Sequence, residues 1–104
     1  VREAERLHRR AIKLDPARHD AHSNLGILYL RSERYDEAEE MFLKAARCDA
    51  SHAETHYLIG EARIALSNFT GACIALREAL RLDPGFIEAD LLLAHSLFEA
   101  GPGG

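Results

Sequence analysis

The sequence predicts an all-α fold, in which antiparallel helix pairs stack into an α-solenoid. Three observations support this prediction: an internal repeat of 34 residues, apolar residues at helical spacing within each repeat, and small residues at fixed places in it. The chain has 104 residues, of which 47% are hydrophobic, so it can bury a core. No segment alternates polar and apolar residues as a half-buried strand would.

The repeat is clearest where the helices are predicted to end. Asp15-Pro16 recurs as Asp83-Pro84, two periods further along the chain, and Asp49-Ala50 lies halfway between them. A period that is kept along the whole chain predicts a stack of similar units. Other residues in the same register are Ala4, Ala38 and Ala72, then Ala11, Ala45 and Ala79, then His22 and His56, and then Gly26 and Gly60.

The apolar spacing predicts six helices, at roughly 2–14, 20–32, 36–48, 54–66, 70–82 and 87–99. Pro16 and Pro84 end the helices before them, because proline disfavours a helical conformation in the preceding residue. Short connections make successive helices antiparallel neighbours. The chain therefore divides into the second helix of an incomplete repeat (1–18), two full repeats (19–52 and 53–86), the first helix of another incomplete repeat (87–100) and a flexible tail (101–104).

Gly26 and Gly60 stand at the same place in successive repeats, inside a predicted first helix. Glycine within a helix costs about 0.5–1 kcal/mol relative to alanine. Its recurrence therefore indicates that the second helix approaches closely there. We expect Gly60→Leu to cost several kcal/mol through overpacking.

This pattern resembles the tetratricopeptide repeat, whose first helix carries Leu-Gly and Tyr and whose second helix carries Ala and a large apolar residue before a closing Pro. Departures are His22 and His56 in the aromatic slot, Ala50 in place of Pro, and Arg63 in place of Tyr. The resemblance covers essentially the whole chain and implies a right-handed superhelical array. The matching residues are Leu25, Gly26, Tyr29, Ala38, Phe42 and Ala45 in one repeat, and Ile59, Gly60, Ala72, Leu76, Ala79 and Pro84 in the next.

The composition disfavours several classes of partner. Thirteen Lys and Arg against seventeen Asp and Glu give a net charge of −4, which argues against nucleic acid and against anionic membranes. No apolar run is long enough to span a bilayer. Two cysteines, Cys48 and Cys73, are expected to be free thiols in a reducing compartment, which favours the cytoplasm. The chain begins without Met, and we expect it to be part of a longer array.

The resemblance implies a non-catalytic scaffold for protein–protein interaction, which holds a partner protein or peptide on a concave face lined by the first helices. That face mixes acidic and apolar residues, so we expect a basic and apolar partner segment. The candidate partner-binding residues are Asp20, Ser23, Asn24, Ile27, Glu54, Tyr57, Leu58, Glu61, Ile64, Glu88, Leu91 and His95, with Arg31, Leu92, Phe98 and Glu99 on the same helix faces.

Two special binding modes of the family can be tested residue by residue. Repeats that clamp the C-terminal carboxylate of chaperones use Asn, Lys and Arg, and only Asn24 matches, because Glu54 and Leu58 stand at the other places. Repeats of the protein O-linked N-acetylglucosaminyltransferase carry an asparagine ladder. Asn24 looks like one rung, but Leu58 and Leu92 occupy the next two.

No catalytic residue, cofactor or metal ion is predicted. His52 and His56 are spaced i, i+4, and Cys48 lies four residues before His52, so a metal site is conceivable. The structural interpretation is preferred, in which His22 and His56 fill the aromatic slots of successive repeats. No nucleophile with a base and no glycine-rich phosphate loop is visible.

The alternative function is a structural spacer or a self-assembly segment of a larger protein, which could be an enzyme. The predicted helices 2–14 and 87–99 each lack a partner, and the second of them is apolar nearly all round. The two half-units add up to one whole unit. A homo-oligomer could therefore form when these terminal helices associate head to tail.

Overall fold

The computed structural model describes residues 2–101, and every regular element within that range is a helix. The predicted helix bounds are confirmed to within one residue at each end. Of the predicted tail 101–104, only Gly101 lies within the described residues. The helices are α1 (Arg2–Leu14), α2 (His19–Arg31), α3 (Tyr35–Cys48), α4 (Ala53–Ala65), α5 (Phe69–Leu82) and α6 (Ile87–Ala100).

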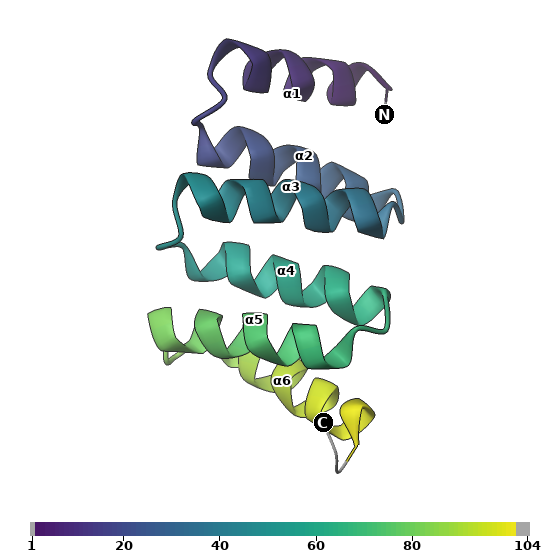
Figure 1. Ribbon diagram of the computed structural model, residues 1–104, viewed down its shortest axis with the longest axis vertical. Coiled ribbons are helices and arrows are strands. Elements are labelled where there is room, and N and C mark those ends of the chain that lie inside the picture. Colours follow the sequence, from purple (N-terminus) through teal and green to yellow (C-terminus); the bar gives the residue numbers. More distant parts are fainter. Residues whose placement is uncertain (1, 102–104) are drawn as a thin grey trace.

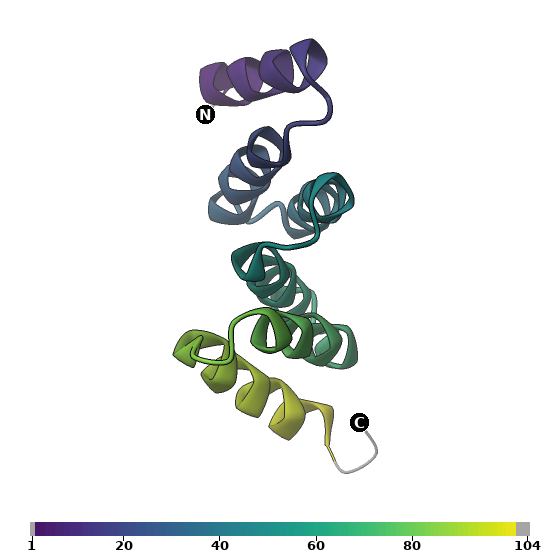
Figure 2. The same cartoon turned by 90° about the vertical axis from the view of Figure 1, so that its left-hand side faces the viewer.

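The helices stack one after another along the long axis of an array that measures 45 × 25 × 19 Å (Figure 1). Seen from the side, α2, α4 and α6 lie on the left and α3 and α5 on the right (Figure 2). Helices α2 and α3 pack extensively as one pair, and α4 and α5 as the next, with less extensive packing between α3 and α4. The predicted all-α solenoid of helix pairs is confirmed.

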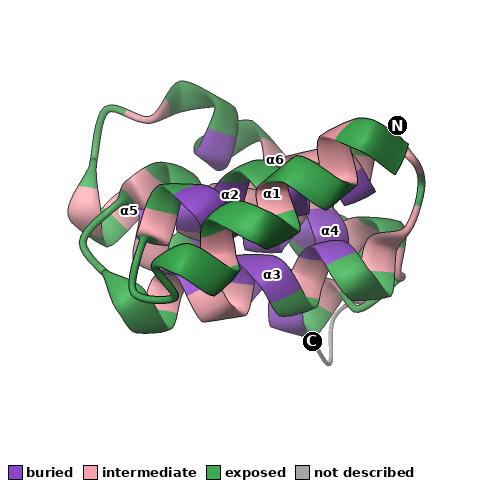
Figure 3. Ribbon diagram, turned by 90° about the horizontal axis from the view of Figure 1, so that it is seen from above, coloured by how far each residue is buried: buried purple, intermediate pink, exposed green. Residues whose placement is uncertain are grey.

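The core lies between the helices, whose outer sides remain exposed (Figure 3). One apolar cluster centres on Leu25, Tyr29 and Phe42, and a second one on Leu76 and Ala79. Phe42 and Leu76, which are in register, are both fully buried. Each full repeat therefore places one large side chain of its second helix at the centre of its own cluster.

Gly26 and Gly60 form the notches into which these two side chains fit. A Cβ atom on Gly26 would lie 2.5 Å from Cε1 of Phe42, and one on Gly60 would lie 2.8 Å from Cγ of Leu76. Contacts that short do not occur between real carbon atoms, so a side chain at either glycine would force Phe42 or Leu76 to shift. The predicted close approach is confirmed.

The turn within each full pair repeats a strained conformation. Glu33 and Ser67, which are in register, have φ angles of 60° and 59°. Left-handed backbone at a residue other than glycine costs on the order of 1–2 kcal/mol. An equivalent backbone hydrogen bond closes the turn in both pairs. Arg34 N–H donates to the Tyr29 carbonyl at 2.8 Å, and Asn68 N–H donates to the Arg63 carbonyl at 2.8 Å.

The first and last helices are the least covered. Helix α1 has no buried residue, and α6 buries only Ala89 and Ser96. Leu91 and Phe98 of α6 are 66% and 81% exposed. The expectation that α6 is apolar on a side without a partner is confirmed. Within residues 2–101, no helix has the length and apolar character needed to cross a bilayer.

Candidate interaction surfaces

The predicted partner-binding residues come from α2, α4 and α6, which adjoin on one side of the array (Figure 2). We call this side the α2–α4–α6 face. It comprises exposed residues Asp20, Asn24, Arg31, Glu54, Glu88, Leu91, His95, Phe98 and Glu99, and half-buried residues Ile27, Tyr57, Leu58, Glu61, Ile64 and Leu92.

Ser23 is a correction to this set. It was expected on the exposed face, but it is buried, with 9% of its surface exposed. Its Oγ atom has no hydrogen-bond partner within residues 2–101. Ser23 therefore belongs to the packed side of α2.

The carboxylate of Asp20 is already neutralised within the chain. Arg18, which precedes α2, donates to both oxygens of Asp20 at 2.9 and 2.5 Å. Hydrogen bonding from Arg18 lowers the pKa of Asp20. Of the acidic residues on the face, this one is therefore the least available to a partner.

Glu61 differs from Asp20 because no cation accompanies it. It is half-buried in the middle of α4, and no Lys, Arg or His of residues 2–101 lies within 4.0 Å of its carboxylate. Burial raises the pKa of Glu61. Burial also raises the pKa of Tyr57, and the negative charges of Glu61 and Glu88 raise it further. Tyr57, Glu61 and Glu88 therefore form a negatively charged group where α4 meets α6.

The α6 end of the face is apolar. Leu91 and Phe98 extend outward from α6, whereas the ring of His95 lies edge-on to Phe69 of α5, with 6.3 Å between ring centroids. In the preceding repeat, the residues at the same register positions are covered by packing. Leu91 and Phe98 correspond to Tyr57 and Ile64, which pack against the second core cluster.

A polar network that the sequence analysis missed fastens α1 to α2. The Tyr29 hydroxyl donates to Glu5 at 2.8 Å, and Arg34 donates to the other oxygen of Glu5 at 3.1 Å. Arg9 donates to both Glu5 and the Tyr29 hydroxyl. These hydrogen bonds lower the pKa of Glu5 to about 2, and the bond from Tyr29 contributes most. The Arg34 guanidinium lies 4.3 Å from the centre of the Tyr29 ring, where its charge is also favourable.

The next junction repeats this network with other residues. Glu39 is in register with Glu5, and Arg63 is in register with Tyr29. Arg63 donates to Glu39 at 2.7 Å and to the Gly71 carbonyl at 3.0 Å. Arg63, which departs from the family pattern, therefore joins α4 to the helices before and after it. The 34-residue spacing of Glu5 and Glu39 was a signal that could have pointed to both networks.

The histidines and cysteines serve separate contacts. Cys48 donates to the Pro16 carbonyl at 3.6 Å, His52 stacks on His19 at 4.0 Å, and His56 contacts the Ala50 carbonyl at 3.0 Å. The described residues contain no group of three ligands that could hold a metal ion. The conceivable site at Cys48, His52 and His56 is therefore not assembled. Both cysteines are free, and Cys73 is buried as a small apolar residue.

Many solved structures share this fold, among them the following three. The second TPR domain of human RPAP3, in complex with the HSP70 peptide SGPTIEEVD, is 27% identical, with a TM-score of 0.86 over 88% of this chain and 77% of that one. YrrB, described as a TPR protein with an unusual peptide-binding site, is 27% identical, with a TM-score of 0.88 over 96% of this chain and 52% of that one. The O-GlcNAc transferase of Thermobaculum terrenum is 27% identical, with a TM-score of 0.82 over 89% of this chain and 18% of that one.

The sequence itself matches two family models. Both are described as tetratricopeptide repeat, and they cover residues 1–62 and 53–86. No curated protein matches the chain in sequence. The first family model spans more than half of the chain, and the glycine notches repeat in the register that the family requires. This chain belongs to the tetratricopeptide repeat family.

Proposed function

We propose that this chain is a non-catalytic module for protein–protein interaction, which binds a basic and apolar segment of a partner along the α2–α4–α6 face. The observation that carries the proposal is the unpaired, half-buried carboxylate of Glu61 beside Tyr57 and Glu88. A carboxylate that burial disfavours gains most from a cation that reaches it, because the pair is screened less than one in open water.

The apolar part of the face supports the same kind of partner. Leu91 and Phe98 offer exposed apolar surface next to the acidic group, so a segment with alternating basic and apolar side chains can satisfy both. Such an arrangement favours the correct partner mainly through charge complementarity, which rejects acidic segments.

This partner differs in charge from the peptide in the RPAP3 complex. That peptide, SGPTIEEVD, ends in two glutamates, a valine and an aspartate. In this chain, Glu54 and Leu58 stand where the carboxylate clamp of the family has Lys and Arg. We therefore expect the α2–α4–α6 face to repel a peptide of that kind, although the fold is shared.

The test compares two synthetic peptides of opposite charge. One alternates Lys and Leu, and the other has Glu in place of each Lys. The ¹⁵N-labelled chain is titrated with both and followed by NMR. We expect only the basic peptide to shift signals of α4 and α6, with weaker binding at higher salt. Equal shifts of the α4 and α6 signals with the two peptides would contradict the proposal.

Two variants locate the binding site. Glu61→Lys should weaken binding of the basic peptide on the order of tenfold. Glu3→Lys makes the same change of charge on the exposed side of α1 and should leave binding nearly unchanged. If Glu61→Lys and the unaltered chain bind the basic peptide equally well, the carboxylate of Glu61 is not the anchor.

Self-assembly is a second candidate function, and the register of the terminal helices favours it. Ala94 of α6 is exposed and corresponds to Gly26 and Gly60, whereas His8 of α1 corresponds to Phe42 and Leu76. Helix α6 of one copy could therefore pack on α1 of the next copy as first and second helices do within a repeat, giving a head-to-tail chain of molecules.

Light scattering during size-exclusion chromatography tests this candidate over a range of concentrations. Self-assembly predicts a mass that rises with concentration, and it predicts that Ala94→Glu returns the chain to a monomer. A monomer mass that does not change with concentration contradicts it.

A further inference from the structure

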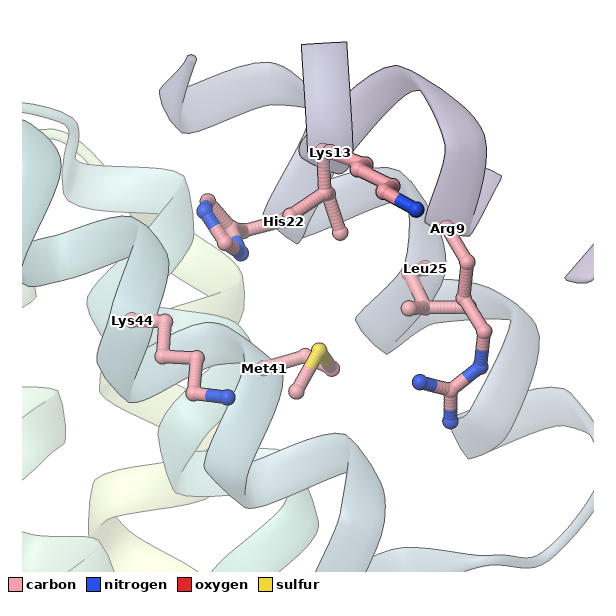
Figure 4. Close-up of a pocket in the computed structure, with 7 residues that line it drawn as sticks. Arg9, Lys13, His22, Leu25, Met41 and Lys44 are labelled. Carbon is pink, nitrogen blue, oxygen red and sulfur yellow. The ribbon is translucent and has the colours of Figure 1, made fainter. Parts of the chain in front are cut away.

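A groove runs between α1 and α3, the second helices of successive repeats. It consists of two adjoining hollows of about 160 and 430 Å³ that share Ile12, His22 and Lys44. Leu25 and Met41 form the apolar floor of the smaller one (Figure 4). The smaller volume suits a single side chain, since a dry cavity of about 150 Å³ holds one benzene molecule.

The walls of the groove carry four cations in a protein whose net charge is negative. Arg9, Lys13 and Lys44 line the smaller hollow, and Lys44 and Arg47 line the larger one. Arg9 is paired with Glu5, and Lys44 has only an exposed partner, Glu40, at 3.7 Å. Lys13 and Arg47 have no carboxylate within 4.0 Å in the described part of the chain. The groove therefore presents positive charge that the chain itself does not neutralise.

The corresponding groove between α3 and α5 carries less positive charge. One period further along, Lys13 and Arg47 correspond to two arginines, Arg47 and Arg81. Arg9, however, corresponds to Leu43, and Lys44 corresponds to Glu78. Glu78 is moreover paired with Arg81 at 2.5 Å. The positive charge is thus greater in the first groove than in the second.

His22 supplies a second, independent indication of a ligand. Its side chain lines both hollows and only 6% of it is exposed (Figure 4). Nε2 lies 2.9 Å from the Pro16 carbonyl, which can only accept, so Nε2 carries the proton and the neutral ring has an acceptor at Nδ1. Nδ1 is buried and has no hydrogen-bond partner within residues 2–101. A buried acceptor without a donor is unfavourable, and a donor from a ligand would remove that cost.

We propose that the groove between α1 and α3 binds an acidic peptide segment of a second protein, on a different surface from the α2–α4–α6 face. One apolar side chain of the segment enters the hollow above Leu25 and Met41. Its carboxylates lie beside Lys13, Lys44 and Arg47, and a backbone N–H donates to Nδ1 of His22. A peptide supplies all three features together, whereas a free inorganic anion supplies only the charge.

The test uses the pentapeptide Glu-Asp-Leu-Asp-Glu, acetylated and amidated at its ends. The chain, labelled with ¹⁵N and with ¹³C in its methyl groups, is titrated and followed by NMR. We expect shifts at the methyl groups of Ile12, Leu25 and Met41 and at the His22 ring. Shifts confined to α4 and α6 would overturn the proposal. The same shifts with sodium acetate at equal carboxylate concentration would also overturn it, since they would reveal a site for bare anions.

Matched variants test the role of the cations. Lys13→Glu should weaken binding of the acidic peptide at least about tenfold. Arg10→Glu makes the same change of charge on α1, at a residue that lines neither hollow, and should change binding by less than about twofold. Equal loss in both variants would mean that only the overall charge matters, and it would overturn the assignment to the groove.

His22→Phe keeps an aromatic ring in a slot that the family fills with aromatic residues, so the fold should remain intact. It removes Nδ1 and should weaken binding several-fold, and unchanged binding would contradict the role of His22. Glu61→Lys separates the two proposals, because it should weaken the basic peptide on the α2–α4–α6 face and leave the acidic peptide unaffected.

Discussion

The full repeats and the flanking helices follow the same 34-residue pattern but differ in how far they are covered. Phe42 in α3 is fully buried, whereas its counterpart in α1, His8, is half-buried, and α1 buries no residue at all. Gly60 is buried, whereas its counterpart in α6, Ala94, is exposed. Neighbouring helices therefore decide the burial of a position, as is expected in a solenoid where each unit contacts only the next.

The two flanking helices are also attached by different forces. Helix α1 is joined to α2 through the network of Glu5, Tyr29 and Arg34, which is largely polar. Helix α6 is joined to α4 and α5 by apolar packing: Ala89 belongs to the second cluster, and Leu93 packs against that cluster. Acid and salt should therefore loosen the α1 end before they affect the α6 end.

The largest expected effect is on the free energy of unfolding, and it distinguishes a buried phenylalanine from an exposed one. Phe42→Ala should lower the free energy of unfolding by about 3–5 kcal/mol, because it empties the centre of the first cluster. Phe98→Ala, at a residue that is 81% exposed, should change it by less than about 0.5 kcal/mol. Urea denaturation measures both, and similar losses would contradict the difference between the middle and the end.

A second pair of variants tests the notch. Gly60→Leu should cost about 2–3 kcal/mol, because the added atoms overlap Leu76. Ala94→Leu adds a side chain at the same place in the next unit, where the surface is open, and should be nearly neutral. Thermal unfolding measures the stability of both variants. A Gly60→Leu variant as stable as the unaltered chain would refute the close contact.

The smallest expected effect concerns pH and sharpens the comparison of the two ends. The folded pKa of Glu5 is about 2, below its ordinary value of 4.5, so its stabilisation is complete above pH 4.5 and is lost as the pH falls toward 2. Glu5→Gln should therefore lower Tm slightly at pH 7, and the difference from the unaltered chain should vanish near pH 2. A difference that does not depend on pH would show that the Glu5 network is unimportant.

The sequence was sufficient to predict the fold because its repeating constraints are local. Gly26, Gly60 and the two Asp-Pro pairs recur at a fixed step, and each marks a helix contact or a helix end within one unit. The helix bounds and the glycine notches followed from this register. The burial of Ser23 did not, because it depends on packing that a single helix pattern does not encode.

The candidate sites were only partly predictable. The acidic and apolar residues on the first helices could be named from the register, but pairing of Asp20 with Arg18 could not, since both side chains had to be placed first. The groove between α1 and α3 was also missed. It depends on second helices of different repeats, and its cations at Lys13 and Lys44 belong to no sequence motif.

Each full helical hairpin is closed by the same turn, which has a left-handed residue, Glu33 or Ser67, and a backbone hydrogen bond across it. We therefore expect the array to change shape first at the joints between hairpins, where α3 meets α4 and α1 meets α2, because packing is less extensive there. We expect such a change to alter the spacing of the hairpins while each hairpin keeps its shape.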